Sequence, residues 1–142
     1  MDTFPTLRHG DRNAAVRVVQ YLLNDRGITV TVDGIFGPKT ENAVKSFQAD
    51  SGLRQDGVVG AQTWSRLIRT LQDGSSGPAV KAVQVILSRK VLPSVDVDGL
   101  FGPKTKAAVK SFQTDQNLQQ DGIVGPQTWR ALASEAALDS ED

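Results

Sequence analysis

The sequence predicts an all-α protein made of two tandem three-helix units that pack without a long linker. One observation is an internal repeat, because residues 33–64 and 98–129 align at an offset of 65 with 23 of 32 positions identical. Another is the spacing of apolar residues in three segments of each copy, which is typical of amphipathic helices. A third is an octapeptide that occurs four times, as Asp-Gly, two apolar residues, Gly, Pro or Ala, Lys or Gln, and Thr. These repeats divide the chain into unit 1 (1–70), unit 2 (71–134) and a tail (135–142).

The first helix of each unit follows from its cap and its apolar face. Asn13 precedes Ala14 and is a good N-cap residue, and Val16 and Val19 begin an apolar stripe. Unit 2 has Pro78 at the first helical position, where the missing N–H costs nothing.

The second helix of each unit is expected to begin at Pro38 and at Pro103, by the same argument. It should end at Gly52 in unit 1 and at Asn117 in unit 2, since these residue types best adopt the left-handed conformation beyond a helix end.

The third helix follows Gly60 and Gly125. In unit 1 its apolar spacing continues to about Thr70, so a helix of that length is expected. In unit 2 residues 134–138 extend the pattern, and the last four residues are expected to fray.

Composition excludes several classes of function. The chain has no cysteine and one histidine, His9, which excludes disulfides, thiolate zinc sites and multi-histidine metal centres. Lys and Arg number nine against seven Asp and Glu in residues 1–71, and seven against five in 72–133, while residues 134–142 hold four acids. Two mildly basic units with an acidic tail do not suggest nucleic-acid binding. No apolar run is long enough to span a membrane, and the chain begins without a secretory signal.

The order of the motifs resembles the peptidoglycan-binding domain family, a three-helix cell-wall-binding repeat of bacterial and phage cell-wall hydrolases. Each copy carries Gly-x5-Val-x3-Gln, then DGxFGxxTxxAVxxFQ, then LxxDGxVGxxTW. The resemblance covers both units and nearly all of the chain. It implies non-catalytic attachment to bacterial peptidoglycan, with no cofactor and no metal, and action at the cell wall. We expect a monomer.

Candidate ligand-binding residues lie in the four octapeptides. Each octapeptide leads into a helix N-terminus, where unpaired backbone N–H groups attract anions such as stem-peptide carboxylates. We expect a shallow groove near Asp33, Lys39, Thr40, Asp56, Gln62 and Thr63 in unit 1, and near Asp98, Lys104, Thr105, Asp121, Gln127 and Thr128 in unit 2. The competing interpretation is that the threonines bond only within their own helical turn and the aspartates only within their own loop.

Two other functions stay open at this point. One is a small cell-wall hydrolase that uses aspartates, although each octapeptide aspartate precedes a turn glycine, where a structural role is more common. The other is a protein-interaction module that keeps the fold without the polymer. The aromatic residues Phe36, Phe47 and Trp64 and their partners in unit 2 have the spacing of core residues rather than of a sugar-stacking platform.

Overall fold

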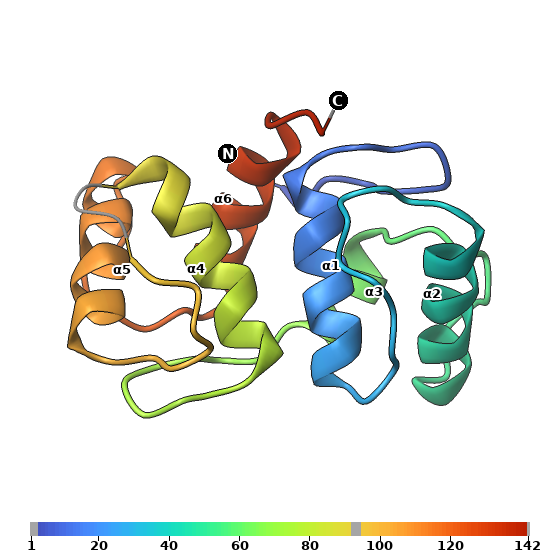
Figure 1. Ribbon diagram of the computed structural model, residues 1–142, viewed down its shortest axis with the longest axis horizontal. Helices are drawn as coiled ribbons and strands as arrows, with labels where there is room; N and C mark the ends of the chain where they lie inside the picture. Colours follow the sequence, from blue (N-terminus) through green and yellow to red (C-terminus); the bar gives the residue numbers. More distant parts are fainter. Residues whose placement is uncertain (1–2, 92–94, 142) are drawn as a thin grey trace.

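The computed structural model describes residues 3–91 and 95–141, and within these ranges the protein is helical with no strand (Figure 1). None of the helices in these ranges is long and apolar enough to cross a membrane. Unit 1 contributes the first three helices and unit 2 the next three: α1 (Ala14–Asp25), α2 (Pro38–Asp50), α3 (Ala61–Leu67), α4 (Pro78–Lys90), α5 (Pro103–Asp115) and α6 (Pro126–Ala137).

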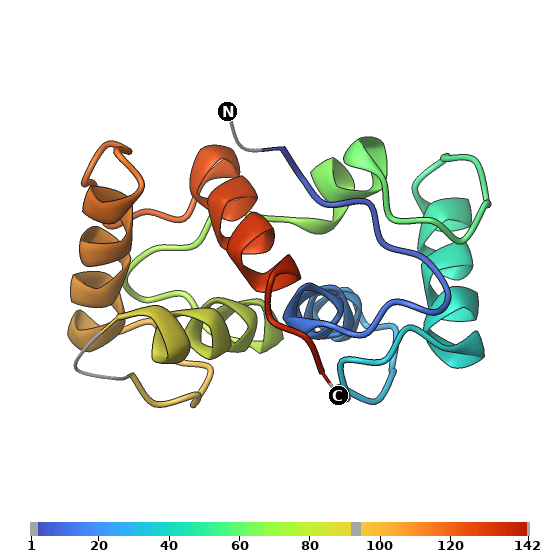
Figure 2. The same cartoon turned by 90° about the horizontal axis from the view of Figure 1, so that it is seen from above.

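The first helices of the two units, α1 and α4, lie side by side at the centre and run in opposite directions (Figures 1 and 2). Helices α2 and α5 lie at the two outer ends, and α6 crosses beside α1. The buried apolar side chains of both units form one continuous core. The two units therefore form a single packed body, as the absence of a long linker predicts.

The expected helix boundaries are confirmed at most positions. The Asn13 side chain accepts a 3.1 Å hydrogen bond from the N–H of Val16, as an N-cap does. Beyond α2 and α5, Gly52 (φ 71°) and Asn117 (φ 58°) take the left-handed conformation. The six predicted core aromatics are buried, the most exposed being Phe47 at 6%.

The predicted length of the third helix in unit 1 is wrong, because α3 ends at Leu67 rather than near Thr70. The Arg26 guanidinium donates hydrogen bonds to the carbonyl oxygens of Arg66, Leu67 and Ile68, which satisfies the end of the helix from outside it. The chain is then extended, and Leu71 pairs with Val124 in an isolated bridge that begins unit 2.

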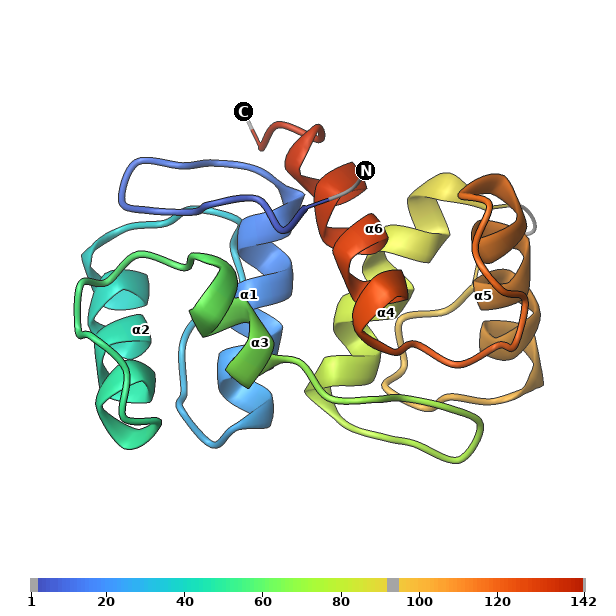
Figure 3. The same cartoon turned by 180° about the vertical axis from the view of Figure 1, so that it is seen from behind.

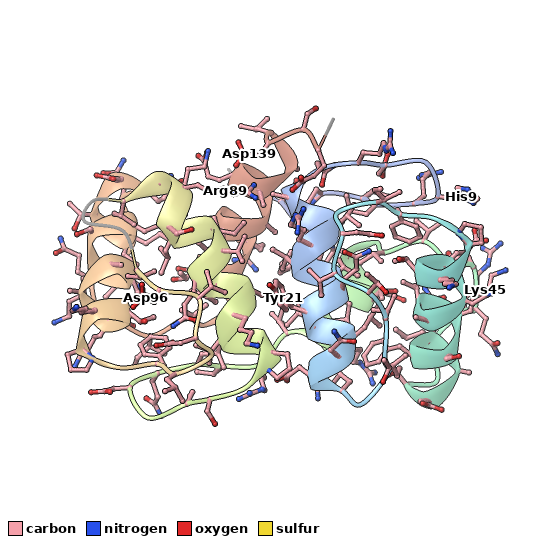
Figure 4. The ribbon with its side chains drawn as sticks, viewed as in Figure 1. His9, Tyr21, Lys45, Arg89, Asp96 and Asp139 are labelled. Carbon is pink, nitrogen blue, oxygen red and sulfur yellow. The ribbon has the colours of Figure 1, made fainter. Side chains whose placement is uncertain are left out.

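The fraying expected for the acidic tail is also wrong for its described part. Helix α6 continues to Ala137, and the carbonyl oxygen of Asp139 accepts from the N–H of Ala14 at the start of α1. Glu141 pairs with Arg17 of α1 at 2.6 Å and with Arg89 of α4 at 3.6 Å. The tail thus stays ordered because it closes the upper end of the α1–α4 pair, where Figure 4 shows Arg89 and Asp139 close together.

The opposite end of the same helix pair is closed by Asp25, the last residue of α1. Its carboxylate accepts two hydrogen bonds from the Arg69 guanidinium and one, at 3.1 Å, from the N–H of Ala79 in the first turn of α4. The cap residue Gly77 has no side chain, so a residue of unit 1 supplies the N-terminal cap of a helix in unit 2.

Candidate functional site

Each of the four octapeptides folds into a turn that is held by a buried glutamine. In the first turn, the Gln20 amide nitrogen donates to Asp33 Oδ1 at 2.9 Å, to the Ile35 carbonyl oxygen and to Thr40 Oγ1. Its amide oxygen accepts from the N–H groups of Asp33 and Gly34. The glutamine is fully buried and comes from α1, so the first helix fixes the shape of the loop before α2.

The same arrangement recurs at the other three turns. Gln84 holds the turn that begins at Asp98. Gln48 and Gln113 hold the turns that begin at Asp56 and Asp121, each with the aspartate, a carbonyl oxygen, the threonine and the glycine N–H as partners. None of the buried side-chain polar atoms in the described ranges lacks a partner.

The octapeptide aspartates bond their own turns. The Oδ1 atom of each accepts from the N–H two residues onward, at 2.9–3.0 Å. At Asp56 and Asp98 this backbone hydrogen bond lowers the pKa, with help from the glutamine amide. At Asp33 burial raises the pKa, but the N–H of Ile35 and the Gln20 amide outweigh it, so the pKa is again lowered. With lowered pKa values, the carboxylates of Asp33, Asp56 and Asp98 stay ionised at neutral pH. All four octapeptide aspartates are exposed.

The octapeptide threonines are buried, at 3–5% exposure, with their hydroxyls turned toward the glutamine amides. Lys39, Gln62, Lys104 and Gln127, in contrast, are exposed. The turns therefore split the predicted residues into an inner set that shapes the loops and an outer set that faces solvent.

Two matching hollows lie beside the second turn of each unit. Hollow 1, of about 270 Å³, is lined by Gln48, Leu53, Arg54, Asp56, Val58, Gly60, Ala61, Gln62 and Thr63. Hollow 2, of about 460 Å³, is lined by Gln113, Leu118, Gln119, Asp121, Ile123, Gly125, Pro126, Gln127, Thr128 and Arg130. The first nine members of each set correspond at the offset of 65, so the repeat has built the same hollow twice.

The single groove expected in unit 1 is divided between two places. Lys39 lines another hollow, of about 470 Å³, with residues 28–31 and the outer face of α2. Lys39 is in the first turn of α2, whereas hollow 1 lies beside the last turn, and a helix of 13 residues is about 20 Å long. Asp33 and Thr40 line neither hollow, and Asp98, Lys104 and Thr105 do not line hollow 2.

Residues 12–67 and 76–132 each match the family model described as "Putative peptidoglycan binding domain". The chain belongs to this family. Its peptidoglycan-binding domains account for most of its length, and hollows 1 and 2 lie one in each matched region.

Relatives of these peptidoglycan-binding domains include two cell-wall enzymes. The zinc D-Ala-D-Ala carboxypeptidase of Streptomyces albus G is 36% identical over 99 residues, which cover 68% of this chain and 38% of that protein. The N-acetylmuramoyl-L-alanine amidase CwlM of Mycobacterium tuberculosis is 33% identical, over 89% of this chain and 37% of the amidase. The chain thus spans well under half the length of either enzyme.

Among solved structures, a peptidoglycan-binding protein from Clostridioides difficile is 40% identical to this chain. The match covers 47% of this chain and 42% of that one, with a TM-score of 0.45.

Some residues that line hollows 1 and 2 were missed by sequence reasoning. Arg54 lines hollow 1 from the loop, where unit 2 has Gln119, whereas Arg130 lines hollow 2 from α6, where unit 1 has Ser65. Because the two arginines stand at different positions of the repeat, alignment of the copies gives no signal for either.

The arrangement offers no metal site in the described ranges, where no group of three His, Asp or Glu side chains is placed to hold an ion. A glycosidase acid needs a raised pKa, and the octapeptide carboxylates with resolved shifts have lowered ones. The amide, guanidinium and carboxylate groups that line the hollows suit recognition by hydrogen bonds and charge.

Proposed function

We propose that this chain binds bacterial peptidoglycan without cleaving it, through hollows 1 and 2, and tethers an attached or associated activity to the cell wall. The observation that carries the proposal is that nine equivalent residues line a hollow in each of two domains of a peptidoglycan-binding family.

The chemistry of each hollow fits the polymer. A carboxylate of Asp56 or Asp121 accepts from amide N–H groups, the Gln62 or Gln127 amide both donates and accepts, and Arg54 or Arg130 attracts a carboxylate. Stem peptides carry amides and carboxylates, and the glycan strand carries hydroxyls and acetamido groups. Leu53 or Leu118 also lines each hollow and offers apolar contact.

The remaining predicted residues form a second type of candidate surface, which occurs once at the start of α2 and once at the start of α5. Lys39 and Lys104 are its exposed cations, while Asp33 and Asp98 with their buried threonines, Thr40 and Thr105, shape the turns beneath. We propose that this surface contributes charge to wall binding and that the protein acts as a monomer.

Co-sedimentation with purified insoluble peptidoglycan tests the proposal, with the turbidity of the suspension followed in the same tube. The native chain should enter the pellet while turbidity stays constant. A variant with both Gln62→Trp and Gln127→Trp should stay in the supernatant, because an indole at these exposed positions obstructs both hollows. Leu138→Trp should sediment like the native chain, because it changes an exposed residue that lines neither hollow and lies at the opposite end of α6 from hollow 2.

Falling turbidity would instead indicate a hydrolase. A native chain that stays in the supernatant with several wall chemotypes would overturn the proposal and favour a protein partner.

A further inference from the structure

The two hollows are related by an approximate two-fold rotation, and the contacts at the ends of α1 and α4 establish it. The end of α1, at Asp25, caps the start of α4 at Ala79. The start of α1 is joined to the end of α4 through Glu141, which contacts both Arg17 and Arg89. The two equivalent helices are therefore antiparallel neighbours.

Two antiparallel helices that lie side by side are exchanged by a rotation about an axis perpendicular to the plane that holds them both. Such an axis keeps equivalent features on one face and reverses their direction. Figure 3 shows this, because the loops of residues 51–60 and 116–125, which border hollows 1 and 2, both lie on the face seen from behind. The hollows share a face but point opposite ways along it.

Each hollow is also complete in itself. Each has its own aspartate and glutamine, and each has one arginine, Arg54 in hollow 1 and Arg130 in hollow 2. Neither hollow needs a residue of the other unit for its lining.

A peptidoglycan strand has a direction, since its glycan has a reducing and a non-reducing end and its stem peptides have an N- and a C-terminus. A site that reads the strand in one direction therefore reads it in the opposite direction when it is rotated by the two-fold axis. A stiff strand that lies across both hollows therefore runs in the wrong direction through the second one.

We infer that the chain holds two separate peptidoglycan strands at once, one in each hollow, and does not lay one strand along both. This inference rests on the proposed function. It makes the chain a bridge between strands. A strand held in one hollow does not raise the effective concentration of ligand at the other hollow.

A bridging assay tests the inference with soluble, un-cross-linked glycan strands that carry stem peptides. One pool is biotinylated and immobilised, and a second pool is fluorescent and free. Retention of the protein on the immobilised strands is measured first, and capture of fluorescent strands second. The proteins compared are the native chain, Gln62→Trp, Gln127→Trp and the Leu138→Trp control, each checked for a native circular dichroism spectrum.

The native chain and Leu138→Trp should capture fluorescent strands. The immobilised strands are spaced too far apart for one protein to reach two of them. Either hollow variant should then lose the capture, while its retention on immobilised strands falls only about twofold, because one independent site of two remains. Retention without capture, with a loss far beyond twofold in each hollow variant, would show one strand across both hollows and overturn the inference. Absence of any retention of the native chain would instead overturn the proposed function itself, and the inference with it.

Discussion

Units 1 and 2 share their buried framework but differ in the charges laid over it. In unit 1, a Cβ atom added to the turn glycine Gly34 would lie 2.7 Å from the Glu141 side chain, and one added to Gly57 would lie 2.8 Å from Glu41. An acidic side chain thus lies nearest to each turn, with the basic side chains of Arg17 and Lys45 next to it.

In unit 2 the equivalent turns are covered by lysines. The nearest side chain to a Cβ added at Gly99 is Lys81, and at Gly122 it is Lys106. All four glycines have positive φ, near 70–76°, and all four turns keep the glutamine hydrogen bonds. The comparison teaches that the buried glutamine and the glycine determine the turn, while the covering charge is free to change.

Removing the buried glutamine should have the largest effect and should be equal in the two units. Gln20→Leu and Gln84→Leu each leave two backbone N–H groups, a carbonyl and a hydroxyl without their buried partner. We expect each to lower the free energy of unfolding by about 3 kcal/mol. Urea denaturation measures it, with the exposed Gln72→Leu as control. A loss in one unit only would contradict a shared framework.

Asp25 has no acidic counterpart in unit 2, where Arg89 occupies the equivalent place in α4. Asp25→Ala should cost about 2 kcal/mol, because Arg69 and the N–H of Ala79 both lose a charged partner. Burial raises the pKa of Asp25, but the hydrogen bonds from Arg69 and from the N–H of Ala79 outweigh burial, so the pKa lies below its ordinary value.

This stabilisation by Asp25 depends on pH. A lowered folded-state pKa contributes stability that is present above the unfolded pKa of about 3.9 and is lost as pH falls through the folded value. The difference between the native chain and Asp25→Ala should therefore be full at pH 6 and shrink below about pH 4. A constant difference across unfolding curves in this range would argue against the ion pair. Asp50→Ala, an exposed residue of α2, is the control.

Glu141→Gln should have a smaller effect, about 0.5–1 kcal/mol, since its ion pairs with Arg17 and Arg89 are partly exposed. The hydrogen bond from Arg17 lowers the pKa of Glu141, so its contribution also disappears in acid. Thermal unfolding in low and high salt measures it, and the native chain and the variant should converge as salt increases. If the native chain and the variant still differ in stability at high salt, the tail stabilises the fold by packing alone.

The smallest effect on stability is expected at the exposed lysines. Lys39→Glu and Lys104→Glu should each change the free energy of unfolding by less than about 0.5 kcal/mol. Both should weaken sedimentation with peptidoglycan, more at low salt than at moderate salt. Unchanged binding with a native circular dichroism spectrum would remove the start of α2 and α5 from the binding surface.

Local signals in the sequence were sufficient for most of the fold. Pro38 and Pro103 mark helix starts, and Gly52 and Asn117 mark the residues beyond helix ends, because these preferences act within a few residues. The end of α3 could not be found in this way, since the guanidinium that satisfies its carbonyl oxygens belongs to Arg26, about 40 residues earlier. The docked tail was missed for the same reason.

The candidate site was predictable only in part. The repeat identified the octapeptides and showed that Gln20 matches Gln84. Their role in holding the turns could be recognised only from the fold, which places the first helix of each unit against its turn. The division of the expected groove follows from the length of α2, which separates Lys39 from Asp56. Arg54 and Arg130 stand outside the repeat pattern, so only the folded chain places them in equivalent hollows.

The antiparallel pairing of α1 and α4 has a consequence for the origin of the molecule. A surface that meets its own copy across a two-fold axis is the isologous interface of a homodimer. An ancestral protein with one such unit could have paired with itself through its first helix, and gene duplication would then have joined two subunits that already fitted. Fusion freed the two copies to diverge. The equivalent position is now acidic in unit 1, as Asp25, and basic in unit 2, as Arg89.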